Sequence, residues 1–226
     1  MTTLAIMRTA IASQLGDDAA LTNAQIDDAI RTTIAHYARR PWWFTETKNI
    51  TFATVAAQEY YTATDLADIP NIPNIEAATV TYGGIKYPLR FVNFAEMDEL
   101  QTGAITGLPT TLTAYATELR LYPTPDTAYT ITLAYNDKLA ALSADGDSNG
   151  WTTHAEELIR QGAKKRLALD VIASDEIAMR CERLEREAFD ELIAENRRRQ
   201  PRKVLATDLP MTSSTYNVVT GPRITW

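Results

Sequence analysis

The segment RRPWWFTET, residues 39–47, marks the point at which the chain changes from helix to strand. Arg39 and Arg40 suit the C-terminal end of a helix, where the macrodipole is negative, and Pro41 cannot continue a helix smoothly. A period of two begins at Thr47, which is typical of a strand. The sequence therefore places three large aromatic residues at a helix-to-strand junction: Trp42, Trp43 and Phe44.

Two helices are predicted before this junction. Apolar residues recur at spacings of three and four, and Gly16 ends the first helix; they are Leu4, Met7, Ile11 and Leu15. Thr22 and Gln25 then form a predicted capping box, which starts the second helix. Ile26, Ile30, Ile34 and Tyr37 share one face of that helix.

The middle of the chain is predicted to be a small β unit. Short segments with a period of two are separated by turn residues, and Gly83 with Gly84 favours a hairpin. The predicted strands start near Ile50 and continue at 59–62, 77–91, 110–116, 118–122 and 129–135, with one short helix at 93–101. Because these strands are too closely spaced for helical crossovers, an antiparallel sheet or a partly closed barrel is favoured.

Helix returns near Thr152 and extends to about Arg199, with a break near Ser174, which could cap a second helix. The mixed charges of ERLEREAFDE, residues 182–191, are typical of a solvated helix face. The segment after Pro201 has no helical period. The sequence thus predicts an α+β fold: a helical domain from residues 1–45 and 141–200, an inserted antiparallel β domain at 46–140, and an extended C-terminal arm at 201–226.

Composition excludes several classes of protein. The chain has 226 residues, 45% of them hydrophobic, which is enough for one sizeable core or two small ones. Its net charge of −7 is uneven, with −8 over residues 1–150 and +1 over 151–226, so an overall basic nucleic-acid-binding protein is not expected. We expect neither a membrane span nor an export signal. A single cysteine, Cys181, excludes an internal disulfide and fits synthesis in a reducing cytosol.

Few residues suggest catalysis. The only histidines are His36 and His154, and the chain has no GxSxG elbow, glycine-rich phosphate loop or HExxH motif. His36 lacks partners for a general base, and Cys181 is interpreted as a buried apolar residue. A cell-wall-remodelling enzyme would have to use carboxylates such as Glu46 and Glu59. We therefore predict no catalytic residues and no cofactor.

One metal-binding motif is present. DGDSNGWTTHAE, residues 145–156, matches the EF-hand loop pattern through Asp145, Asp147, Asn149, Gly150 and Glu156. However, no helix leads directly into this loop and no second hand is present. The same residue types are common in a turn that leads into a capped helix. The ordinary loop is favoured, with a calcium-dependent binding module as the alternative, and no metal ligand is predicted.

The aromatic junction also has two interpretations. Trp42, Trp43 and Phe44 could stack on exposed bases or sugars, but such platforms usually lie in a positive groove. Only Arg39 and Arg40 are basic nearby. We therefore predict that the rings are buried and hold the helical and β domains together, with Trp151 closing the junction from the other side.

The order of these motifs resembles a known family. The PWWF junction, the run LYPTPDTAYTITLAYNDKL, the turn ending in NGW and the helix opening HAEELIRQGAKKRLA together resemble the head-to-tail adaptor proteins of tailed bacteriophages, over about residues 1–200. The resemblance implies a virion structural protein with no catalytic residues. It implies a ring of usually twelve subunits under the portal, which extends the DNA channel and forms a platform for the tail.

The resemblance also implies partners and a location. The expected partners are the portal protein, other copies of this chain and a downstream tail or nozzle protein, with genomic DNA passing through without sequence-specific binding and no membrane. The expected location is the neck of the virion, after synthesis in the host cytoplasm. The arm from Pro201 onward would reach the portal or a neighbouring subunit.

Overall fold

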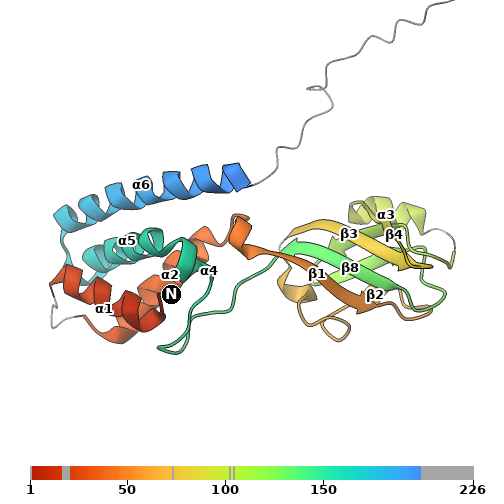
Figure 1. Ribbon diagram of the computed structural model, residues 1–226, viewed down its shortest axis with the longest axis horizontal. Coiled ribbons are helices and arrows are strands. Elements are labelled where there is room, and N and C mark those ends of the chain that lie inside the picture. The colour runs from red at the N-terminus through yellow and green to blue at the C-terminus, as the bar shows by residue number, and fades with distance from the viewer. Residues whose placement is uncertain (1, 17–20, 73, 102, 104, 200–226) are drawn as a thin grey trace, which may run out of the picture.

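The computed structural model describes residues 2–16, 21–72, 74–101, 103 and 105–199. They form a helical body and a β body, joined by a narrow junction (Figure 1). The helices are α1 (Leu4–Leu15), α2 (Asn23–Tyr37), α3 (Phe94–Leu100), α4 (Gly150–His154), α5 (Glu156–Leu167) and α6 (Asp175–Arg199), with single turns η1 (Trp43–Thr45) and η2 (Ile69–Asn71) and the π-helical turn η3 (Ala168–Ile172). The strands are β1 (Glu46–Ala53), β2 (Tyr60–Tyr61), β3 (Asn74–Tyr82), β4 (Ile85–Pro88), β5 (Arg90–Phe91), β6 (Thr111–Tyr115), β7 (Glu118–Tyr122) and β8 (Thr130–Asn136).

The two N-terminal helices have the predicted ends. α1 stops at Gly16, which adopts the left-handed conformation with φ 92° and donates back to the last turn. The capping box of α2 is confirmed: the Gln25 backbone N–H donates to Thr22 Oγ1 at 3.3 Å, and the Thr22 N–H donates to Gln25 Oε1 at 2.9 Å. These local signals therefore define α1 and α2.

The β body contains two four-stranded sheets, of order β1-β8-β3-β4 and β2-β7-β6-β5. The predicted hairpin is present, since β3 pairs with β4 around Gly83 and Gly84. One pairing differs from the antiparallel prediction: β5 and β6 are parallel, with Arg90 opposite Thr111. This is possible because α3 lies between the two strands and returns the chain to the same end of the sheet. Neither sheet closes into a barrel within the described residues.

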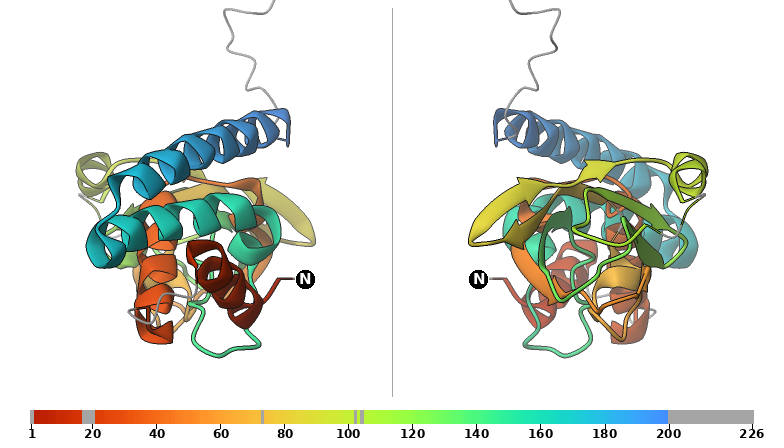
Figure 2. Two further views of the ribbon diagram at one scale, coloured as in Figure 1. Left: turned by 90° about the vertical axis from the view of Figure 1, so that its left-hand side faces the viewer. Right: turned by 90° about the vertical axis from the view of Figure 1, so that its right-hand side faces the viewer.

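The C-terminal helices break at the predicted place. Ala173 adopts the left-handed conformation with φ 54°, and Ser174 then accepts from the Ile177 N–H at 3.5 Å. Seen along the long axis of the molecule, α6 lies over α5, with α1 on the other side of α5 (Figure 2). α5 is therefore the central helix of the body, and it is covered by both N-terminal and C-terminal helices.

Each body has its own buried apolar cluster. Ile30, Trp42 and Ile159 belong to the helical cluster, whereas Tyr61 and Ile131 belong to the β cluster. This architecture confirms the predicted α+β class with an inserted β unit. The predicted arm at 201–226 lies outside the described residues. Within the described part of the chain, no helix combines the length and apolar character that a membrane span requires.

Candidate functional site

The first candidate site is the aromatic junction. Trp42 has no exposed surface, and its indole N–H donates to the Tyr37 carbonyl at 2.9 Å. Its ring packs edge-on against Trp151, with centroids 6.1 Å apart, and against Phe189 of α6 at 6.2 Å. Trp151 is also buried. A ring enclosed in this way cannot stack on a base or sugar, so the buried interpretation holds for Trp42.

The neighbouring aromatic rings are half-buried. Trp43 and Phe44 contact the exposed His154, with ring centroids 5.8 and 5.6 Å apart. All of these rings pack on helical residues and belong to or border the helical cluster. The prediction that they lie between the two domains is therefore corrected, since they fix the start of β1 to the helical body. The rings pack on the helical body because the chain reaches Trp42 directly from α2.

The β body is joined to this junction by backbone and polar contacts. The Asp137 N–H donates to the Thr45 carbonyl at 2.7 Å, and Thr45 Oγ1 donates to Asn136 Oδ1 at 3.1 Å. Thr45 and Asn136 are both buried. The two chain segments that enter and leave the β body are thus held together where they cross the junction.

The end of α6 is attached to the same junction, which the sequence did not predict. The Asn196 side chain accepts from the Trp43 N–H at 3.0 Å and donates to the Pro41 carbonyl at 3.3 Å. The Arg199 guanidinium lies 4.9 Å from the centre of the Trp43 ring, a cation–π contact. Since Asn196 is buried and satisfies two backbone groups, it anchors the C-terminal part of α6 to the junction.

A buried polar group also ties three helices together. Glu185 of α6 accepts from the Tyr37 hydroxyl at 2.8 Å and forms an ion pair with Lys165 of α5. Burial, together with the Glu185 carboxylate, raises the pKa of the Tyr37 hydroxyl. The interpretation of residues 182–191 as a solvated face is therefore wrong for Glu185 and for Phe189, which packs on the helical cluster. Helix periodicity could have shown this, because both residues follow the apolar stripe through Cys181 and Leu192.

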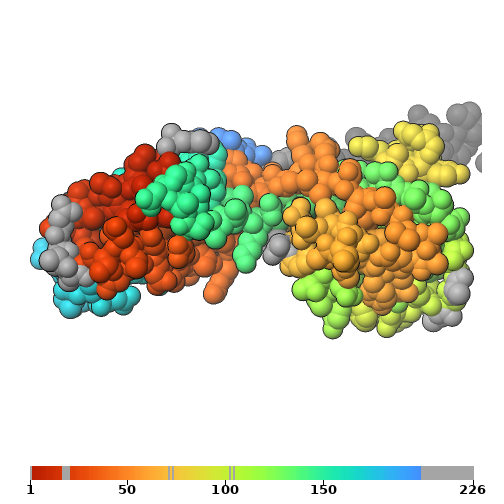
Figure 3. All heavy atoms as spheres, turned by 90° about the horizontal axis from the view of Figure 1, so that it is seen from below, coloured from red at the N-terminus to blue at the C-terminus, as the bar shows by residue number. Residues whose placement is uncertain are grey.

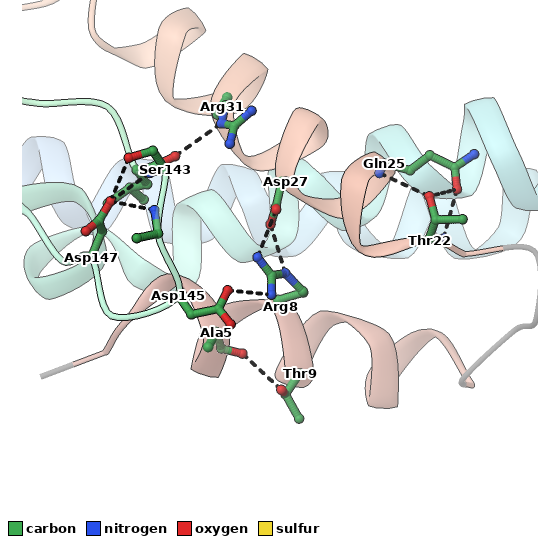
Figure 4. Close-up of polar contacts among 12 residues, drawn as sticks. Ala5, Arg8, Thr9, Thr22, Gln25, Asp27, Arg31, Ser143, Asp145 and Asp147 are labelled. Atoms are coloured by element: carbon green, nitrogen blue, oxygen red, sulfur yellow. Dashed lines mark hydrogen bonds and ion pairs between the residues drawn. The ribbon is translucent and has the colours of Figure 1, made fainter.

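The second candidate site is the loop with the EF-hand pattern. The Arg8 guanidinium donates to both oxygens of Asp27, at 2.9 and 2.8 Å, and to Asp145 Oδ1 at 2.9 Å (Figure 4). The carbonyls of Asp145 and Asp147 accept from the first N–H groups of α1. Arg8, which the sequence did not single out, thus joins α1, α2 and this loop.

The other acidic and amide groups of the pattern also have protein partners. Asp147 Oδ2 accepts from the Ser143 and Ala144 N–H groups at 2.8 and 2.7 Å, and these bonds lower the pKa of that carboxyl (Figure 4). Asn149 caps α4 by accepting from the Trp151 N–H at 2.9 Å, and Glu156 accepts from the Thr2 hydroxyl at 2.6 Å. These contacts are those of a turn that leads into capped helices.

The loop is also not folded as an EF-hand. α4 begins at Gly150, the sixth position of the pattern, so more than half of the twelve residues are helical or at helix ends. Among the residues that the structure describes, no group of three or more His, Cys, Asp or Glu side chains is arranged to hold a metal ion. The geometry gives the calcium alternative no support.

The carboxylates considered for catalysis lie apart in the fold. Glu46 begins β1 in the first sheet, and burial, with Glu76 nearby, raises its carboxyl pKa. Glu59 lies beside β2 of the second sheet and forms an ion pair with Arg120. His36 is exposed, and Cys181 is buried, which raises the pKa of its thiol. The structure assembles no acid/base pair from Glu46 and Glu59.

A third feature is a groove of about 540 Å³ beside the junction. One wall is the end of α2 with Pro41, and the other is the segment that leaves β8. The apolar lining includes Ile34, Ala35, Ala38, Leu139, Ala140 and Ala141. Arg31, Arg39, Arg40 and Lys138 supply basic groups at the same groove. Viewed from below, the molecule narrows here between its two bodies (Figure 3).

Comparison with known proteins adds one finding. A family model described as SU10 adaptor protein matches residues 1–207. The match covers both bodies and continues past α6. The comparison with curated proteins finds no match to this chain. The family match confirms the resemblance to phage adaptors that the motif order indicated.

Proposed function

The chain belongs to the SU10 adaptor protein family, and on this basis we propose that it forms a head-to-tail adaptor ring bound under the portal of a phage capsid. Its family makes it a phage structural adaptor, a component of the virion. In this proposal, about twelve copies form the ring and extend the DNA channel, and the tail or nozzle protein attaches below the ring. The observation that carries this proposal is the family match over residues 1–207.

The shape of the molecule supports a ring. A closed ring uses two different complementary surfaces on each subunit, which an elongated chain of two bodies can supply (Figure 1). Large apolar side chains are exposed on each body. Tyr82 and Ile85 are 56% and 59% exposed at the β3–β4 turn, and Leu169 and Met179 are 52% and 65% exposed near the turn from α5 to α6. These positions provide separate surfaces for two neighbours.

The charge of the chain fits passage of DNA. Residues 1–150 carry a net charge of −8. An acidic surface that faced the channel would repel phosphates and so discourage DNA from binding during transit. No sequence-specific contact with DNA is required for this role.

Electron microscopy of the chain mixed with its portal tests the proposal. We expect closed rings stacked on the portal, with one adaptor layer and density for residues after Arg199. The variant Ile85→Asp tests one exposed surface: it adds a charge at a side chain outside both buried clusters, so it should fold but assemble poorly. Particles that carry only unassociated monomers beside filled, portal-containing capsids would contradict the ring.

A further inference from the structure

We propose that in the free chain the segment 204–209, which follows α6, binds in the groove beside the junction of the same molecule. The proposal concerns the unassembled chain and does not depend on the ring. The groove is defined by the residues given above, between the end of α2 and residues 136–142.

The end of α6 lies close to the groove. Asn196 donates to the carbonyl of Pro41, and Pro41 is itself part of the groove wall. Arg199, the last residue of α6, lies over Trp43. The chain therefore leaves the helix within one turn of a groove residue. Six extended residues span about 20 Å, enough to bring Leu205 along the wall of α2.

The groove has an apolar lining that the described residues leave uncovered. Ile34 and Leu139 are half-buried, and Ala35, Ala38 and Ala140 are exposed. A groove of about 540 Å³ is large enough for several side chains of an extended segment. Burial of such a surface is favourable because it removes apolar area from water.

The sequence after α6 matches this lining in chemistry. VLATDL, residues 204–209, has three large apolar residues and Asp208, which is the only acidic residue between 201 and 226. The groove has Arg39, Arg40 and Lys138 along its walls, with Asp137 as the acidic residue of its lining. The segment can thus place apolar side chains on the apolar lining while its one carboxylate faces basic groups.

An engineered disulfide tests the contact in the full-length chain. Cys181→Ala removes the native thiol, and Ala38→Cys with Leu205→Cys places one thiol in the groove and one in the segment. At low protein concentration we expect an intrachain disulfide, identified by non-reducing electrophoresis and peptide mass spectrometry.

The matched control keeps Leu205→Cys and replaces Ala38→Cys by Met179→Cys. Met179 lies on the same helix, 20 residues before Arg199, which is about 30 Å along α6 and beyond the reach of Leu205. We expect the groove pair to form the disulfide at least tenfold faster than the control pair. Equal rates would overturn the proposal. Disulfides only between chains would also overturn it, and would assign the groove to a segment of a second copy.

A second measurement avoids new cysteines. Hydroxyl-radical footprinting of the full chain reports the solvent access of Leu139 and Ile34. Leu205→Asp should displace the segment and raise the oxidation of both side chains severalfold, whereas the control Val219→Asp, outside residues 204–209, should not. If the two variants give the same oxidation as the unmodified chain, the segment does not occupy the groove.

Discussion

At the scale of single residues, the aromatic junction depends most on Trp42. Its ring is fully buried among Trp151, Phe189 and the helical cluster, and its indole N–H has a backbone partner. Removing such a ring leaves a cavity and takes away the indole donor to the Tyr37 carbonyl. Trp42→Ala should therefore lower the free energy of unfolding by about 3 to 5 kcal/mol, measured by urea denaturation. Trp43→Ala is the control: this ring is half-buried, so its loss should cost clearly less.

If Trp42→Ala left stability unchanged but abolished binding to a portal or another partner, the platform interpretation would return. Equal losses for the two variants would instead indicate that Trp43 is enclosed to the same degree as Trp42, contrary to its partial exposure.

Asp147 gives a prediction for the dependence of stability on pH. Backbone and side-chain donors from Ser143 and Ala144 lower the pKa of its carboxyl in the folded state. Its contribution is therefore fully present above the unfolded pKa of about 4, and it is lost as the pH falls through the folded value. Asp147→Asn should lower stability at pH 7 relative to the parent chain, and the difference should vanish at lower pH.

The measurement is denaturation of both chains at several pH values, with an NMR titration of the Asp147 carboxyl. A carboxyl that titrates at or above the ordinary value for aspartate would contradict the hydrogen bonds seen in this loop. The same experiment with added Ca²⁺ tests the EF-hand pattern: since Asp145 and Asp147 already have protein partners, calcium should not raise stability.

At the scale of elements, close packing of α2, α5 and α6 depends on Gly162. A Cβ there would lie 2.6 Å from Thr33 Cγ2 and 2.8 Å from Glu185 Oε1. Both neighbours are buried, and Glu185 is held by Tyr37 and Lys165. Gly162→Ala should therefore destabilise the chain by about 1 to 3 kcal/mol despite the better helix propensity of alanine.

Gly146→Ala is the control for this substitution, because a Cβ at Gly146 meets nothing within 4 Å. Thermal unfolding of both variants gives the comparison. A gain in stability for Gly162→Ala would mean that the three helices separate easily and that the Glu185 contacts do not hold them.

The elements that could be predicted from sequence are those with local signals. The Thr22 capping box, the Gly16 stop and the break before Ser174 all act within one or two turns, and β8 alternates between more and less buried side chains over most of its length. The parallel pairing of β5 with β6 was missed because it depends on how α3 reverses the chain. The β hairpin was found because its turn is local.

The candidate sites show the same limit. Burial of Trp42 could be argued from its place at a helix-to-strand junction. The partners of Arg8, Asn196 and Glu185 could not be predicted from the sequence. Each of these contacts joins residues that are at least 19 positions apart. Nor could a pattern match reveal that the carbonyls of Asp145 and Asp147 accept from the first N–H groups of α1, because that depends on α1 packing beside the loop.

At the scale of the whole molecule, the two bodies raise the question of whether they fold separately. Each has its own buried cluster, and among the described elements the helices of one body make no extensive contact with the strands of the other. Within the part of the chain that the structure describes, the backbone crosses between them only at Thr45–Glu46 and after Asn136. We propose that residues 46–140 and the two flanking helical segments are distinct domains.

Reciprocal substitutions test this division. Ile30 and Ile131 are both fully buried, one in each cluster. Replacing either by alanine should lower the free energy of unfolding of its own body by about 2 to 5 kcal/mol. Hydrogen exchange should then show faster opening of α5 but unchanged β8 in Ile30→Ala, and the reverse in Ile131→Ala, because separate cores open independently. Each variant serves as the control for the other. If either substitution speeds exchange equally in both bodies, the molecule unfolds as one cooperative unit. The junction at Trp42, Thr45 and Asn136 must then couple the unfolding of the two cores.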